Sequence, residues 1–224
     1  MVSRMQNRVC NAEDKWGRCD KCVIAEFRRS VVLRGNGHVR SGTVERDGYN
    51  LYYQGEPNSS ERPEEAFMTP KGPFLLFLGE APGECEDITG QPFMGEAGRI
   101  LNLMFSMCSE SFQFEVTNIL GCRPSKHNKR GEVVNRTPSQ KEIENCTPRI
   151  TELLEEITYD GIVYLGKTAA SFVVRKGPPT LSLLHPSYIL RQEYKVSILR
   201  QQANKLDNHV KDIIKQKQED SDRG

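Results

Sequence analysis

The sequence predicts an α/β protein with three layers, α/β/α, in which helices cover both faces of a central, mainly parallel, four-stranded sheet. Short continuous apolar runs, typical of buried strands, alternate along the chain with segments whose apolar residues recur at helical spacing. The 224 residues fit one ordinary domain, or one domain with an appendage, and they contain no internal repeat. In such sheets ligands bind beyond the carboxyl ends of the strands, so we expect the loops that follow the strands to meet at one cleft.

Four apolar runs predict the strands. The clearest, "PFLLFLG", is a continuous apolar run that ends in glycine, which is typical of a buried strand. The runs "FEVTNILGC" and "GIVYLG" have the same character, and "LSLLHPSYIL" begins as a strand and continues into a loop or turn. These four segments lie at residues 73–79, 114–122, 161–166 and 181–190.

Helical periodicity predicts the segments between and after the strands. "GEAGRILNLMFSMC" has apolar residues at helical spacing, and a second helix begins at Ser139, where Glu142 three residues later completes a capping-box pattern. A short helix follows the third strand, and an amphipathic helix closes the fold. The helices are expected at residues 95–108, 139–157, 167–174 and 197–216, with polar loops at 80–93 and 123–138.

Composition changes along the chain indicate its organisation. The segment after the first 34 residues is rich in Gly, Ser, Pro, Asn and charge, which predicts a long irregular insertion with room for a short hairpin at 49–55. We therefore expect an N-terminal segment packed on the main domain, a loop-rich insertion, an α/β domain and a frayed tail, at residues 1–34, 35–72, 73–216 and 217–224.

Charge and hydropathy exclude some classes of protein. No apolar stretch approaches the roughly 20 residues that span a membrane, and the N-terminus has no apolar segment typical of a secretory signal. We therefore expect an intracellular protein, cytoplasmic or nucleoid-associated and not secreted. With 31 basic and 30 acidic residues the net charge is +1, so only local clusters of charge can indicate nucleic-acid binding.

Four of the seven cysteines form a candidate ligand set. Cys19 and Cys22 lie two residues apart in "GRCDKC", while Cys122 follows the second predicted strand and Cys146 lies in the next helix. In a reducing compartment such cysteines are thiols or metal ligands rather than disulfides. A zinc ribbon has two tight pairs and this chain has one, whereas a [4Fe–4S] cluster accepts one tight pair plus two scattered thiolates. Spacing alone leaves a structural metal and buried free thiols both open.

Four ordered motifs carry a specific resemblance. They are "GEAPGECEDITGQPFMGEAGRIL", "TNILGCRP", "NRTPSQKEIENC" and "HPSYILR", at residues 79–101, 117–124, 135–146 and 185–191. Together they resemble the uracil-DNA glycosylase superfamily, in particular its iron–sulfur-containing branch, family 4. The cysteine pair also falls where that branch has its first two cluster ligands.

The resemblance implies an activity, a cofactor and a partner. It implies a monofunctional, monomeric glycosylase that flips deoxyuridine out of single- or double-stranded DNA and hydrolyses the N-glycosidic bond, leaving an abasic site. It also implies that Cys19, Cys22, Cys122 and Cys146 hold a [4Fe–4S] cluster that supports the DNA-binding loops and takes no part in the chemistry. Two alternatives stay open, a non-catalytic module that binds uracil or a modified pyrimidine in DNA, and a zinc-stabilised structural protein.

Three residues of the motifs are expected to recognise uracil and stabilise its departure. Phe93, after Pro92 in a rigid turn, is expected to stack on the flipped base. The amide of Asn118 offers a donor and an acceptor that match uracil O4 and N3–H, whereas cytosine presents the opposite pattern. His185, restrained by the following proline, is expected to donate to uracil O2 as negative charge develops there.

The remaining site residues have supporting roles. Backbone amides of "GEAPG", at Gly79 and Ala81, are expected to contact the base, and Glu80 to position water or to stabilise the sugar cation. Glu86 is expected to fill the space near uracil C5 and so exclude the methyl group of thymine. Ser187 is expected to bind a phosphate that flanks the flipped nucleotide.

The chain departs from the family in two long insertions, at 35–72 and between Cys122 and Cys146. A sibling branch carries in the second insertion a histidine that captures the sugar covalently, and this chain has Asn135 where that histidine would lie. We therefore expect hydrolysis with turnover rather than a covalent trap. The basic stretch 123–136 is expected to follow DNA phosphates.

Overall fold

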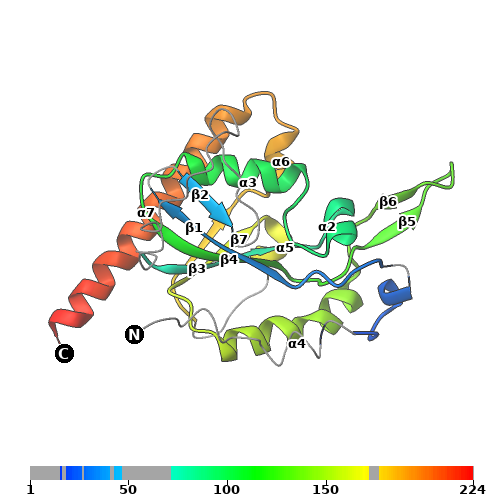
Figure 1. Ribbon diagram of the computed structural model, residues 1–224, viewed down its shortest axis with the longest axis horizontal. Coiled ribbons are helices and arrows are strands. Elements are labelled where there is room, and N and C mark those ends of the chain that lie inside the picture. The colour runs from blue at the N-terminus through cyan, green and yellow to red at the C-terminus, as the bar shows by residue number, and fades with distance from the viewer. Residues whose placement is uncertain are drawn as a thin grey trace, which may run out of the picture.

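A computed structural model describes Trp16 and residues 19–26, 28–40, 43–46, 72–171 and 177–223. Its centre is a six-stranded sheet in the order β2-β1-β4-β3-β7-β8, with helices on both faces (Figure 1). The strands β3, β4, β7 and β8 are parallel, which confirms the predicted parallel core. Their bounds are Phe74–Gly79, Phe112–Asn118, Gly161–Leu165 and Thr180–Leu183.

Alternation along β3 divides the core into two layers. Leu75 and Phe77 belong to a cluster with α3 and α7, whereas Leu76 and Leu78 belong to a second cluster with α4. Because successive side chains of a strand point to opposite faces, a run that is apolar at every position is what a sheet covered on both faces requires. The helices are α3 Glu96–Ser106, α4 Gln140–Glu156, α5 Lys167–Ala170, α6 Pro186–Leu190 and α7 Lys195–Asp222.

The expected four-stranded sheet is too small by two strands. Part of the predicted loop-rich insertion forms an antiparallel hairpin, β1 Arg34–Arg40 and β2 Thr43–Arg46, and β1 pairs with the free edge of β4. The sequence "RGNGHVR" has little β-propensity, so the hydrogen-bonding edge of β4, rather than an apolar pattern, accounts for this strand. The hairpin expected at 49–55 lies outside the described residues.

Two other predicted loops contain regular structure. Within 80–93, α2 spans Glu84–Thr89 and ends at Gly90, whose φ of 73° suits glycine. Within 123–138, β5 Ser125–His127 and β6 Val133–Asn135 form a separate two-stranded sheet. Both elements are short and have no apolar face, so the sequence carries no periodicity that would reveal them.

The expected frayed tail is helical where it is described. Helix α7 continues to Asp222, and ion pairs from Lys215 and Arg223 to Glu219, each at 3.9 Å, lie at the helical spacing of four residues. Among the described helices, none combines the length and the apolar character needed to cross a lipid bilayer.

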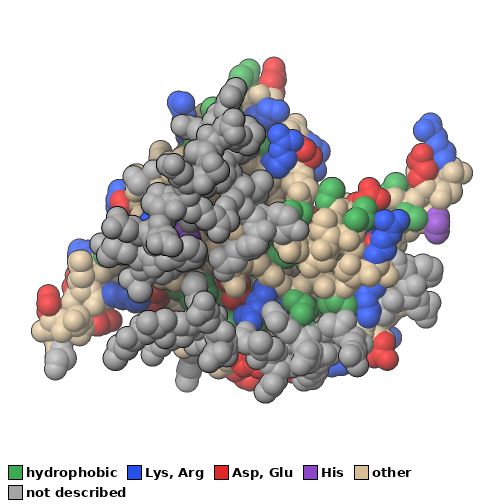
Figure 2. Space-filling model, viewed as in Figure 1, with side chains coloured by type: hydrophobic (Ala, Val, Ile, Leu, Met, Phe, Trp, Pro, Cys, Tyr) green, Lys and Arg blue, Asp and Glu red, His purple; other side chains and the backbone are tan. Residues whose placement is uncertain are grey.

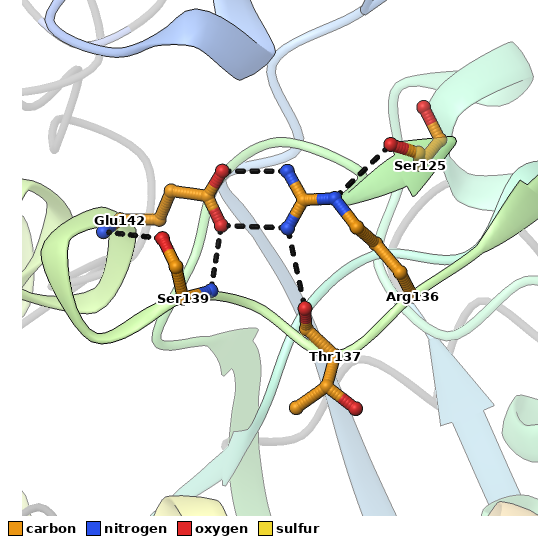
Figure 3. Close-up of polar contacts among 5 residues, drawn as sticks. All are labelled: Ser125, Arg136, Thr137, Ser139 and Glu142. Atoms are coloured by element: carbon orange, nitrogen blue, oxygen red, sulfur yellow. Dashed lines mark hydrogen bonds and ion pairs between the residues drawn. The ribbon is translucent and has the colours of Figure 1, made fainter. Parts of the chain in front are cut away.

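The start of α4 is also the anchor of the β5–β6 hairpin. Ser139 and Glu142 form the predicted capping box, in which the Glu142 carboxylate accepts the Ser139 amide at 2.7 Å. The same carboxylate accepts two hydrogen bonds from Arg136, at 2.8 and 2.6 Å, and Arg136 also donates to the carbonyls of Ser125 and Thr137 (Figure 3). One carboxylate therefore caps the helix and holds the hairpin.

We predict that this carboxylate makes stability pH-dependent. The hydrogen bonds from Arg136 lower the pKa of Glu142 from 4.5 to about 2, so its contribution is present above 4.5 and is lost as the pH falls toward 2. The difference in the free energy of unfolding between wild type and Glu142→Gln should therefore shrink over that interval, as measured by urea denaturation at a series of pH values. Glu144→Gln, an exposed change on the same helix, is the control. A difference that does not vary with pH contradicts the prediction.

Candidate uracil-binding cleft

A cleft of about 410 Å³ lies where the parallel strands end. The loops after β3, after β4 and after β8 all contribute to it, as expected for the carboxyl edge of a parallel sheet. It brings together seven of the residues that the motifs single out, namely Glu80, Ala81, Glu86, Phe93, Asn118, His185 and Ser187.

Asn118, the last residue of β4, is fixed from two sides. The residue is 2% exposed, and the neighbouring strand places Gly79 directly opposite. A Cβ at Gly79 would lie 2.4 Å from Asn118 Oδ1 and 2.7 Å from Phe93 Cζ, so the glycine gives these two side chains their room. Arg149, buried on α4, donates to the Asn118 carbonyl, to Ile119 O at 3.3 Å and to Thr117 Oγ1 at 3.3 Å. Gly79 itself does not line the cleft, but the space it leaves lets Asn118 and Phe93 do so.

Phe93 adopts a strained backbone that its neighbours hold in place. Its φ of 55° is unusual for a bulky residue, and the residue is only 5% exposed. Arg46 donates to the carbonyls of Pro92 and Phe93, each at 3.0 Å. Burial lowers the pKa of Arg46 to about 10, which leaves it charged at neutral pH, and the charge of Glu86 opposes that shift. The turn is therefore pinned by a buried cation from β2.

His185 is the N-cap of α6, and its hydrogen bonds assign its tautomer. Nδ1 accepts the Ser187 amide at 3.1 Å and lies 2.7 Å from Ser187 Oγ. Because a backbone N–H can only donate, the proton of the neutral ring is on Nε2. Burial lowers the pKa of His185 below its usual value, against the charge of Glu80, so the ring is neutral at neutral pH. The ring lies 6.5 Å from that of Phe93, centroid to centroid.

The two carboxylates of the cleft are held differently. One oxygen of Glu80 accepts a hydrogen bond of 2.6 Å from Thr168 Oγ1 on α5. Both oxygens of Glu86 accept backbone amides, from Gly83 at 2.9 Å and from Gly95 at 2.8 Å. Glu86 therefore ties the "GEAPG" loop to the start of α3.

Sequence reasoning missed several residues of the cleft and its support. Tyr188 and Arg191 line it from within "HPSYILR", and Arg136 lines it beside Asn135 from "NRTP", so the motifs carried a signal for all of them. Arg46, which holds the Phe93 turn, lies in a segment expected to be loop and had no sequence signal.

The four cysteines of the candidate ligand set lie in one region next to α4. Cys122 and Cys146 are buried in the apolar cluster on that face of the sheet, and Cys22 packs against it. Burial raises the pKa of Cys122 to about 12, and the thiols of Cys146, Cys22 and Cys19 add to the increase because they are close enough to interact electrostatically. Within the described residues, no group of three or more His, Cys, Asp and Glu side chains is already arranged to hold a metal ion.

The fold and the cleft define an α/β protein with a cleft at the carboxyl edge of its sheet, lined by an aromatic side chain, an amide and an imidazole. Residues 67–214 match the uracil DNA glycosylase superfamily, and the chain belongs to that superfamily.

The chain is similar to several proteins named type-4 uracil-DNA glycosylase. It is 30% identical to the one from Saccharolobus solfataricus over 165 residues, which cover 73% of this chain and 57% of that protein. Identity is 39% to the one from Archaeoglobus fulgidus (44% of this chain, 46% of that protein) and 35% to the one from Thermotoga maritima (52% and 66%). The matches thus span between 46% and 66% of these relatives' own lengths.

We predict that Gly98→Ala disrupts the Phe93 turn. A Cβ at Gly98 would lie 1.7 Å from the carbonyl oxygen of Phe93, a backbone atom that Arg46 also holds. The substitution should lower the free energy of unfolding by about 3 kcal/mol or more, as overpacking of a rigid contact does. The control is Gly95→Ala at the N-cap of the same helix, where the nearest atoms lie at 3.4 Å or more and the loss should be about 1 kcal/mol. Equal losses in the two variants contradict the prediction.

Proposed function

We propose that the protein is a uracil-DNA glycosylase that hydrolyses the N-glycosidic bond of a deoxyuridine extruded from DNA, as a monomer that acts inside the cell. The observation that carries the proposal is the convergence of Phe93, Asn118 and His185 in one cleft, with a buried amide and a neutral imidazole beside an aromatic ring. The names of the relatives supply the same substrate.

Base selection follows from the amide of Asn118. A buried amide that donates to O4 and accepts from N3–H pairs with uracil and leaves two mismatched polar groups against cytosine. Such buried mismatches are costly, which gives discrimination without a further checking step. The Phe93 ring provides a stacking surface worth roughly 1–3 kcal/mol, and this repays part of the cost of unstacking the base from DNA.

Departure of the base requires stabilisation of a uracil anion. The Nε2–H of His185 is the available donor, since Nδ1 is occupied by the Ser187 amide. Protonation at Nδ1 would break that contact, so the neutral ring is the active form. Glu80, which Thr168 holds by a hydrogen bond, is the residue that we assign to the sugar side of the reaction. It either orients the attacking water or stabilises the positive charge that develops on the sugar.

The other cleft residues take secondary roles in the proposal. Ala81 offers its backbone at the cleft wall. Glu86 shapes the loop through its two amide contacts, and we retain its role in excluding the thymine methyl group. Ser187 orients His185 through its amide and hydroxyl, and a phosphate contact by the same residue remains our expectation.

We further propose that Cys19, Cys22, Cys122 and Cys146 hold a [4Fe–4S] cluster. The donor set fits, because four thiols from three segments interact electrostatically beside a buried apolar cluster. When bound, the cluster supplies crosslinks between the N-terminal segment, the loop after β4 and helix α4. In this proposal the cluster would stabilise the site through the segment that follows β4, and it would take no part in hydrolysis.

A base-release assay tests the activity. Purified protein should release free uracil from uracil-containing oligonucleotides, and Asn118→Ala or His185→Ala should each lower the rate about 10²–10³-fold without altering the thermal midpoint by more than a few degrees. Asn208→Ala, an exposed asparagine on α7, is the matched control and should behave as wild type.

Three outcomes contradict this. Uracil-DNA left intact by the wild type overturns the proposal. Tight binding of uracil-DNA without base release indicates a non-catalytic module instead. A protein–DNA adduct that survives denaturant indicates covalent capture of the sugar rather than hydrolysis with turnover.

Metal content tests the cluster independently of activity. Anaerobically purified protein should be brown and contain iron and acid-labile sulfide, and Ser substitution at any one of the four cysteines should bleach it, because each iron needs its thiolate. Cys85→Ser, an exposed cysteine on α2, is the control and should keep the colour. A colourless protein with stoichiometric zinc shows a structural zinc site instead.

A further inference from the structure

The β5–β6 hairpin, residues 125–136, projects from the wall of the cleft. Figure 1 shows the two strands extending away from the rest of the fold, and their sheet has no hydrogen-bonded neighbour among the described strands. At its base, Pro124, Asn135 and Arg136 line the cleft. The hairpin, called the arm below, therefore begins at the site and leads away from it.

The base of the arm is clamped. Arg136 donates to both oxygens of Glu142 on α4 and, through Nε, to the Ser125 carbonyl at 3.1 Å, so a single guanidinium joins the two strands to the helix (Figure 3). Arg123, next to the arm, bonds Asn135 Oδ1 at 2.7 Å. The arm cannot swing without loss of these charge-assisted contacts.

The tip is ordered by its own hydrogen bonds. Asn128 Oδ1 accepts the amides of Arg130 and Glu132 at 2.9 and 3.0 Å, and Asn128 Nδ2 donates to the Glu132 carboxylate at 2.7 Å. Gly131, at φ 78°, completes the turn. Glu132 is the only acidic residue of the arm, and its carboxylate already accepts the hydrogen bond from Asn128.

Three cationic side chains of the arm are exposed, one on β5 and two in the turn. Lys126, Lys129 and Arg130 are all exposed, and none has an ion-pair or side-chain hydrogen-bond partner in the part of the chain that the structure describes. Figure 2 shows Lys and Arg side chains at the outer end of this projection. A stiff element that presents three cations loses little conformational freedom when it binds an anion.

We propose that the arm grips the phosphates of duplex DNA on one side of the extruded nucleotide. The inference rests on the proposed function, which puts that nucleotide in the cleft. At about 3.3 Å per residue, the three residues of β5 and half of the turn reach about 15 Å beyond Ser125. That reach corresponds to about four base pairs at 3.4 Å each. Lysines that contact phosphates carry no base information, so the grip adds affinity and orientation without sequence preference.

The salt dependence of binding tests the grip. The arm variant Lys126→Ala, Lys129→Ala, Arg130→Ala is compared with Lys205→Ala, Lys211→Ala, Lys215→Ala, which removes the same charge from exposed positions on α7. The probe is a duplex that carries a non-cleavable 2′-fluoro-deoxyuridine. Each lost phosphate contact should reduce the slope of log K against log salt concentration by about 0.9, so the arm variant should lose about 2–3 units and the α7 variant almost none. Equal slopes for the two variants overturn the proposal.

Duplex length separates this proposal from the activity itself. Uracil release is measured on a short single strand that cannot reach the tip and on duplexes extended by about four base pairs to the 5′ side or to the 3′ side. The ratio of wild-type to arm-variant kcat/KM should be near one on the short strand and rise at least about fivefold with one of the two extensions, through KM. A ratio that is the same on every substrate, or that rises equally with both extensions, overturns a one-sided grip. No release by the wild type from any substrate overturns the proposed function instead.

Discussion

The cleft depends on the hydrogen bonds that the buried guanidinium of Arg149 donates to the end of β4. The guanidinium joins α4 to the end of β4 by donating to the carbonyls of Asn118 and Ile119, at the point where the strand must stop and present its amide. Burial lowers its pKa, and the nearby charge of Glu115 and the thiols opposes that shift. Removing it would leave buried carbonyls without donors, at about 1–3 kcal/mol each. The backbone that carries the Asn118 amide is thus held by a helix that does not line the cleft.

Helix α4 also connects the cysteines to the cleft, although none of the four candidate ligands lines it. Cys146 lies one turn before Arg149 on α4, and Cys122 lies four residues after Asn118. A crosslink between those two segments would hold α4 and the end of β4 in register, which is the relation that Arg149 enforces from the other direction. A cofactor in that place would support the proposed catalysis through the backbone of Asn118 and would need no redox step.

Much of the fold could be predicted, because the parallel strands and long helices are specified by burial on both faces and by helical periodicity. The cleft could be predicted too, since its motifs sit where such strands end. Elements held by polar contacts could not: the β1–β2 hairpin depends on the edge of β4, α2 on backbone amides, and the arm on Arg136. Arg46 shows the limit, because its role follows only from the φ of 55° at Phe93, which costs about 1–3 kcal/mol and which no sequence pattern reveals.

The cations of the protein differ in whether the fold already engages them. A net charge of +1 gives the molecule almost no general attraction to a polyanion. Under the proposed function, a few placed cations therefore have to orient the molecule on DNA. Three arginines near the site already have hydrogen-bond partners within the fold. Arg46, Arg136 and Arg149 donate to carbonyls and carboxylates, and these contacts fix the backbone geometry. Under the proposed function, cations without an ion-pair partner are the ones available to phosphates. Among the residues that the structure describes, the arm presents three exposed cations of this kind, Lys126, Lys129 and Arg130.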